Sequence, residues 1–162
     1  MGKFIKNEDL KTAEEMLTVL SGDDYNNAYG FHQFGQSFRC VIEPKIGACY
    51  YSVKYGVKKP KRALFTMEFT EDKFRVKANL YHFDMYRDIG KQCSDKIKES
   101  IKSTRNCTRC NPRCIQGSSF QLDGENYFTC IGSGHFFKNM AEKDWNVLKE
   151  LLKQENAIIS GS

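Results

Sequence analysis

The sequence predicts an α+β fold: an antiparallel sheet of about four strands in a meander, three main helices and a small cysteine-rich hairpin lobe. Four segments between residues 37 and 80 alternate apolar and polar residues, which is typical of strands covered on one side. Apolar residues with helical spacing occur once before this region and twice after it. We expect residues 1–157 to form a single α+β domain that includes the lobe at 104–138, followed by a tail at 158–162.

The N-terminal part predicts one helix and one loop. A helix over residues 8–20 is capped by Asn7 and has an apolar stripe of Leu10, Ala13, Leu17 and Leu20. Residues 22–36 are polar, glycine-rich and aromatic, which indicates a loop with room for a short helical turn. His32 lies among the tyrosines and phenylalanines of this loop. These rings either line a ligand cleft or pack onto the sheet.

The four strand segments are residues 37–43, 48–55, 61–69 and 73–80. In the second segment Tyr51, Val53 and Tyr55 share one face, and the other segments show the same period of two. The last two segments are joined by a turn at residues 70–73, which is short enough for a hairpin.

The C-terminal half predicts two helices around the hairpin. A helix over about 85–102 is capped by Asp84. The apolar runs at 120–122 and 127–130 flank a hairpin loop at 123–126, and a short strand follows at 135–138. Asn139 and Glu142 have the spacing of a capping box. The last helix turns four apolar residues inward: Trp145, Leu148, Leu151 and Leu152.

Four cysteines in the lobe have the spacing of a metal site: Cys107, Cys110, Cys114 and Cys130. Zinc takes four tetrahedral ligands, and the hairpin would return the last cysteine to the other three. Three arginines interleaved with the cysteines lower thiol pKa values and offset the charge of the thiolates. His135 is an alternative ligand. Free or disulfide-forming thiols, an iron–sulfur cluster and a catalytic metal are the other interpretations.

The remaining cysteines, Cys40, Cys49 and Cys93, fall on apolar faces of the predicted elements, where cysteine acts as a small core residue. Seven cysteines are an odd number, which argues against a fully paired disulfide framework. No segment has the roughly 20 apolar residues that a membrane span needs, and the N-terminus lacks the apolar region of a secretory signal. We therefore expect a cytoplasmic protein without a membrane partner.

The net charge of +5 is unevenly distributed. Residues 54–113 hold sixteen Lys and Arg against seven Asp and Glu, a net charge of +9. The basic face at 54–77 includes Lys54, Lys58, Lys59 and Arg75. We expect Tyr50 to share a patch with these residues, and such a surface can bind single-stranded nucleic acid. The other interpretation is the solvated edge of a sheet, where lysines discourage pairing with another chain.

The segments KRALFTMEFTEDKFRVKANLY and MAEKDWNVLKELLKQE resemble small uncharacterised bacterial α+β proteins of unknown function. The resemblance covers roughly residues 50–155 and rests on pattern rather than on a diagnostic motif. It implies a curved antiparallel sheet closed by an amphipathic helix. The four-cysteine insert at 107–130 departs from the simplest members of that group.

The sequence favours a binding or regulatory domain with a structural zinc site over an enzyme. No catalytic constellation, phosphate-binding glycine motif or nucleophile elbow is present. We expect the aromatic face of the sheet to receive a small molecule or a protein partner. The alternatives are a nucleic-acid-associated protein that uses the basic face and a thiol- or metal-dependent enzyme.

Overall fold

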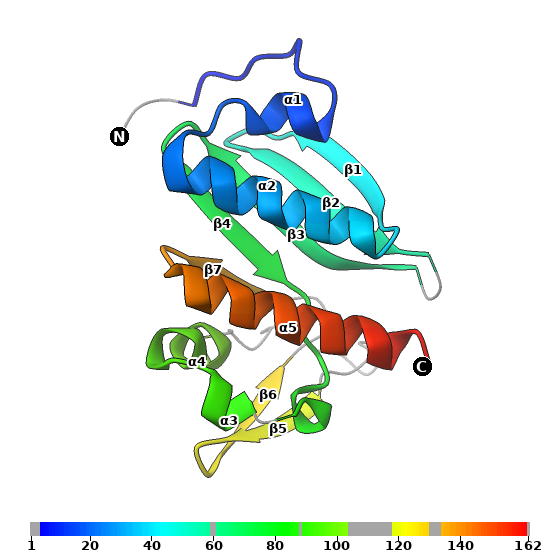
Figure 1. Ribbon diagram of the computed structural model, residues 1–162, viewed down its shortest axis with the longest axis vertical. Helices are drawn as coiled ribbons and strands as arrows, with labels where there is room; N and C mark the ends of the chain where they lie inside the picture. The colour runs from blue at the N-terminus through cyan, green and yellow to red at the C-terminus, as the bar shows by residue number, and fades with distance from the viewer. Residues whose placement is uncertain (1–3, 59–60, 88, 104–117, 130–133, 162) are drawn as a thin grey trace. The chain divides into compact units, whose positions relative to one another are not determined.

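The computed structural model describes residues 4–58, 61–87, 89–103, 118–129 and 134–161 (Figure 1). The chain divides into two compact units, Met1–Lys77 and Ala78–Ser162. Helices and antiparallel strands are both present, which confirms the predicted α+β class. The single domain over residues 1–157 stays a prediction. None of the helices in these ranges is long and apolar enough to cross a bilayer.

The first unit contains the predicted meander. Strands β1 (Val41–Ile46), β2 (Tyr51–Val57), β3 (Arg62–Thr70) and β4 (Lys73–Ala78) are neighbours in that order. The pairs β1–β2 and β2–β3 are antiparallel, with Val53 opposite Met67. Tyr51, Val53 and Tyr55 are buried, which confirms the period of two in this strand. Strand β1 begins later than predicted, because the preceding Arg39 has a left-handed backbone (φ 55°).

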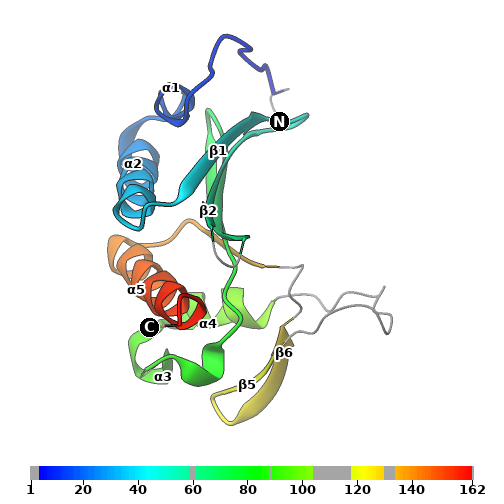
Figure 2. The same ribbon diagram turned by 90° about the vertical axis from the view of Figure 1, so that its right-hand side faces the viewer.

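Two helices cover one face of this sheet (Figure 2). The helix α1 (Ala13–Leu17) is capped by the Thr12 hydroxyl, which accepts a hydrogen bond from the Glu15 N–H. It is shorter than the predicted helix over 8–20. The helix α2 (Gly22–Ser37) occupies the segment for which a loop was predicted, so that prediction is wrong.

Packing rather than intrinsic propensity explains why α2 is helical. Its buried residues are spaced as one helical stripe: Ala28, Phe31, His32 and Gly35. A Cβ atom on Gly35 would lie 2.2 Å from Cδ1 of Tyr55, so only glycine allows α2 to approach β2 this closely. The glycine that indicated a loop therefore serves close packing. The sheet face that we expected to receive a ligand is filled by this helix.

The second unit contains the remaining helices. The predicted helix over 85–102 is interrupted: a 3₁₀ turn η1 (Phe83–Met85), a short α3 (Ile89–Gln92) and α4 (Asp95–Lys102) replace it. The break has a local cause, because the Ser94 side chain accepts a hydrogen bond from the Ile97 N–H and starts a new helix there. The closing helix α5 (Glu142–Ile159) agrees with the prediction, although Ala141 and not Asn139 occupies its N-cap.

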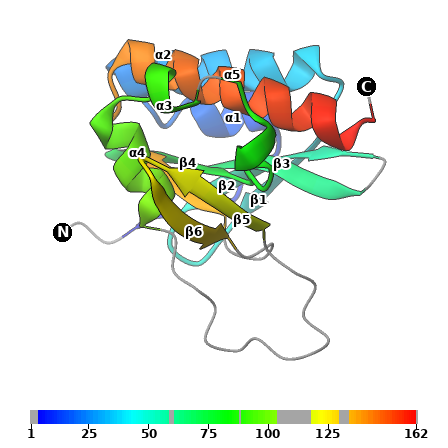
Figure 3. The ribbon, with the colours of Figure 1, turned by 90° about the horizontal axis from the view of Figure 1, so that it is seen from below.

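The predicted hairpin and short strand are also present in the second unit. Strands β5 (Ser118–Leu122) and β6 (Glu125–Thr129) lie side by side and pair antiparallel (Figure 3). Their connection is shorter than predicted, since only Asp123 and Gly124 form the turn, both with positive φ. The strand β7 (His135–Lys138) confirms the predicted strand. The inward positions Trp145, Leu148, Leu151 and Leu152 of α5 are all buried, as expected.

Candidate functional site

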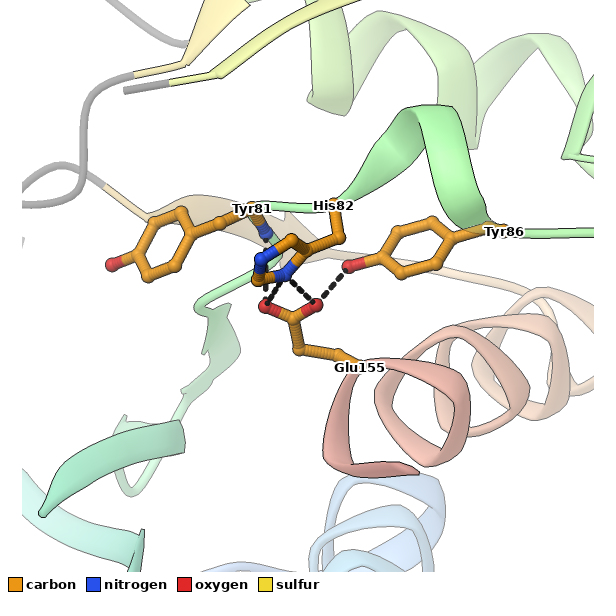
Figure 4. Close-up of polar contacts among 4 residues, drawn as sticks. All are labelled: Tyr81, His82, Tyr86 and Glu155. Atoms are coloured by element: carbon orange, nitrogen blue, oxygen red, sulfur yellow. Dashed lines mark hydrogen bonds and ion pairs between the residues drawn. The ribbon is translucent and has the colours of Figure 1, made fainter. Parts of the chain in front are cut away.

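A buried carboxylate on α5 is the centre of a polar cluster in the described part of the second unit. The side chain of Glu155 is fully inaccessible to solvent. Its Oε1 atom accepts a hydrogen bond from the Tyr81 backbone N–H at 3.2 Å, and its Oε2 atom accepts one from the Tyr86 hydroxyl at 2.9 Å (Figure 4). The Nδ1 atom of His82 lies 2.9 Å from Oε1 and 2.8 Å from Oε2. Burial of a carboxylate is tolerated because several donors replace its water.

The cluster positions the segment that connects β4 to α3. Tyr81, His82 and Tyr86 all belong to this segment, and the neighbouring side chain of Gln154 accepts a hydrogen bond from the Arg87 N–H at 2.8 Å. Two consecutive residues of α5 therefore hold four groups of one connecting segment. The resulting fixed backbone determines where the His82 ring points.

The His82 imidazole is oriented by Glu155 and partly open to solvent. A carboxylate only accepts hydrogen bonds, so Nδ1 of His82 carries the hydrogen. In the neutral ring the other nitrogen, Nε2, is then unprotonated and able to accept a proton or bind a metal ion. The side chain of His82 is 34% exposed. A carboxylate–imidazole pair of this kind occurs in acid–base sites and in metal sites.

The second histidine, His32, has both ring nitrogens occupied in the first unit. Its Nδ1 lies 2.6 Å from the Tyr55 hydroxyl and its Nε2 lies 2.9 Å from Oε1 of Glu14. A carboxylate only accepts hydrogen bonds, so the Nε2–H group of His32 donates to Glu14. In the neutral ring Nδ1 then accepts a hydrogen bond from the Tyr55 hydroxyl. Burial, with the nearby Glu14 charge, raises the pKa of Tyr55 well above its usual range. The His32 side chain is only 2% exposed, which makes it a core residue. The Phe31 and Phe34 rings pack on Phe65 of the sheet as predicted, whereas Tyr25 and Tyr29 are exposed.

The third histidine, His135, is a core residue of the second unit. Its ring meets the Phe83 ring edge-on, with centroids 5.1 Å apart. Burial lowers the pKa of His135 to about 4, and hydrogen bonds to backbone groups of Ser100, Leu80 and Ile101 act in the opposite direction. His82 is therefore the one histidine of the three with a side chain that solvent reaches substantially.

The four cysteines of the predicted zinc site, Cys107, Cys110, Cys114 and Cys130, lie outside the described residues. The described ranges contain no group of three or more His, Cys, Asp or Glu side chains that could hold a metal ion. The described residues do include the β5–β6 hairpin, which lies between Cys114 and Cys130 in the sequence. Its register places Ser118 opposite Thr129, and Cys130 follows Thr129 directly in the sequence.

The other cysteines differ from one another. Cys93 is buried, and burial raises the pKa of its thiol to about 11, which agrees with the predicted core role. Cys40 is half-buried, and burial raises its pKa as well. Cys49 is exposed, so its predicted core position is wrong. It precedes β2, outside the alternating strand.

The basic face is partly neutralised by acidic neighbours. Lys54 forms an ion pair with Glu43 at 2.7 Å, and Arg75 forms one with Glu68 at 2.9 Å. The Arg75 guanidinium also lies over the Tyr50 ring, 5.7 Å from its centroid, as expected if both belong to one patch. These acidic partners lower the positive charge that this face presents to phosphate groups.

The sequence interpretation missed the pairing of Glu155 with His82. A signal was present, because Glu155 continues the inward stripe of α5 by one further step, four residues after Leu151. A charged residue at an inward helical position needs donors from another element. The sequence did not reveal which element supplies them.

Comparisons with protein-family models, with curated proteins and with solved structures found no match to this chain. The resemblance to small bacterial α+β proteins therefore stays a prediction.

Proposed function

We propose that the chain is a small cytoplasmic binding domain whose structural zinc ion is held by Cys107, Cys110, Cys114 and Cys130. The observation that carries this proposal is the register of the β5–β6 hairpin. Paired residues at the open end of an antiparallel hairpin have Cα atoms about 4.5–5.5 Å apart. Ser118 and Thr129 form such a pair. The chain therefore enters and leaves the hairpin at one point.

Chain length supports a shared metal site at this open end. Cys130 is adjacent to Thr129, and Cys114 precedes Ser118 by four residues. Four residues span at most about 14 Å, so covalent connection alone keeps Cys114 near the open end. Bringing the two thiolates to one zinc ion then closes only a short loop, which costs little conformational entropy.

The closed end of the hairpin is attached to α4 independently of any metal. The carboxylate of Asp123 lies 3.1 Å from Nζ of Lys98 and 3.4 Å from Nζ of Lys102. The Phe120 ring packs on Phe83 with centroids 4.4 Å apart. These contacts hold the hairpin body in place, and zinc would fix the cysteine-bearing segments at its other end.

The test is elemental analysis of protein purified without added metal, together with a count of reactive thiols. We expect about one zinc per chain, reduced by the substitutions Cys107→Ser and Cys130→Ser. Cys49→Ser is the matched control, because this cysteine is exposed and lies in the other unit. Full zinc content in both cysteine variants, or no zinc in the unmodified protein, would refute the proposal.

A second candidate function, a thiol- or metal-dependent enzyme, is favoured by the oriented His82–Glu155 pair. The pair has the arrangement of a general base, with a buried carboxylate that fixes the imidazole. If His82 only supports the fold, His82→Gln should change stability and leave the reactivity of the thiols unchanged. A fall in the rate of thiol alkylation in folded His82→Gln protein would favour the enzyme over the binding domain.

A further inference from the structure

A shallow, open surface cavity of about 460 Å³ lies in the first unit beside the start of α2, and most of its lining residues are exposed. Its lining is mostly polar and uncharged: Thr18, Leu20, Ser21, Gly22, Tyr25 and Asn26. This volume falls in the range of about 300–1,000 Å³ for small-molecule pockets, but the cavity is open, so it can hold one face of a monosaccharide-sized molecule while the other face stays in solvent. It lies apart in sequence from both the cysteines and the His82–Glu155 pair.

Two exposed aromatic side chains extend the cavity along α2. Tyr25 and Tyr29 are 36% and 42% exposed. Their rings are nearly parallel, at an interplanar angle of 11°, with centroids 6.1 Å apart. A pair of ordered, solvent-facing tyrosines offers apolar ring surface together with hydroxyl groups, at a low cost in conformational entropy on binding.

The polar groups at the cavity suit a hydroxylated ligand. Ser21 occupies the N-cap of α2 without a side-chain hydrogen bond to the helix. Asn26 contributes an amide, which can both donate and accept. The Thr18 hydroxyl donates to the Glu15 carbonyl, and its oxygen lone pairs can accept.

Charge around the cavity argues against an anion. Asp23 and Asp24 fall between the lining residues Gly22 and Tyr25. Burial and, to a smaller degree, repulsion by the neighbouring Asp23 charge raise the pKa of Asp24. A phosphate or carboxylate would add to this repulsion. A ligand that combines an apolar face with several hydroxyl groups and no charge avoids it.

We propose that the cavity at Tyr25 binds a neutral pyranose ring, with the apolar face of the sugar on Tyr25 and its hydroxyl groups toward Ser21 and Asn26. This inference rests on the proposed binding function and supplies its ligand class. It also assigns a role to the aromatic segment 22–36, whose inward rings form the core and whose outward rings remain exposed.

The test is a titration of the ¹⁵N-labelled full chain with methyl β-glucopyranoside and N-acetylglucosamine, up to about 50 mM, because a single-ring site binds in the millimolar range. We expect saturable shifts confined to the amides of residues 18–29. Tyr25→Ala should weaken binding by about tenfold or more, whereas Tyr25→Phe, which keeps the ring, should stay within about threefold. Phe136→Ala removes an exposed ring of the second unit and is the matched control.

Glucose 6-phosphate and uridine separate the ligand classes. Weaker binding of the phosphorylated sugar is expected from the two carboxyl groups, and uridine should not compete. Uridine binding without glycoside binding would overturn the sugar assignment, as would glycoside shifts that persist in Tyr25→Ala. Zinc content is measured on the same samples. Full zinc content without glycoside binding overturns this inference and leaves the proposed function standing.

Discussion

Replacement of Glu155 tests whether the buried carboxylate organises the second unit. Glu155→Gln keeps the size of the side chain and one acceptor oxygen, but it removes the charge. The amide oxygen can still accept from the Tyr81 N–H and from His82, while the amide NH₂ group turns toward the Tyr86 hydroxyl, which can rotate to accept. We expect the free energy of unfolding to fall by about 1–3 kcal/mol, because one neutral contact replaces a charge-assisted one.

Glu155→Ala has a larger expected effect. It leaves the Tyr81 N–H and the Tyr86 hydroxyl, both on buried residues, without their acceptor. Each abandoned donor costs about 1–3 kcal/mol, and deletion of the side chain also creates a cavity. Part of this loss is offset, because the variant no longer has the desolvation penalty of a buried carboxylate. We therefore expect a loss of about 3–5 kcal/mol. Tyr86→Phe removes one donor only and should cost about 1–2 kcal/mol.

The assay is urea unfolding followed by fluorescence. Trp145 is the only tryptophan in the chain and lies buried on α5, the helix that carries Glu155. Glu150→Gln is the matched control, because Glu150 is an exposed glutamate on the same helix and its substitution should cost less than about 0.5 kcal/mol. Equal midpoints for Glu155→Gln and Glu150→Gln, or a greater loss in Tyr86→Phe than in Glu155→Ala, would refute this account.

Three further substitutions test other parts of the structure. Gly35→Ala should destabilise by about 1–3 kcal/mol in thermal unfolding, since its Cβ would meet the buried Tyr55 ring; an unchanged melting temperature would contradict the close approach of α2. Leu148→Ala should cost about 2–5 kcal/mol, and Asn146→Ala on the exposed side of the same helix should cost little. Because the pKa of His135 falls to about 4 from 6.5, unfolding takes up a proton between these values. The contribution of His135 to the free energy of unfolding is fully present above pH 6.5. It is lost as the pH falls from 6.5 through about 4, at about 1.4 kcal/mol per pH unit. The free energy of unfolding of His135→Asn should therefore decrease less steeply in this pH range, and an identical slope would contradict this assignment.

The strands were predictable from the sequence, whereas α2 was not. An antiparallel sheet with one covered face imposes strict alternation of apolar and polar residues. Strand β2 shows this pattern, because Tyr51, Val53 and Tyr55 are buried and the residues between them are not. The helix α2 contains glycine, asparagine and aspartate, which favour loops in isolation. Its stability comes from contacts with the sheet, such as the Phe31 ring on Phe65 at 5.7 Å. Local propensity carries no information about such contacts.

The candidate site shows the same division between local and distant information. The hairpin that separates Cys114 from Cys130 could be predicted, because turn residues and flanking apolar runs are local signals. The pairing of Glu155 with His82 could not, since 73 residues separate them.

A polar residue within an apolar helical stripe is nevertheless informative in this chain. His32 on α2 and Glu155 on α5 both occupy such positions, and both are buried with hydrogen-bonding partners from distant segments. Burial of either residue without those partners would cost more than the burial of an apolar residue provides. For these two residues the polar interruption of the stripe reflects a long-range contact, even though the sequence does not name the partner. On α2, the buried His32 with its Tyr55 partner is thus the mark of a helix packed on the sheet, and a loop at this position would not need that contact.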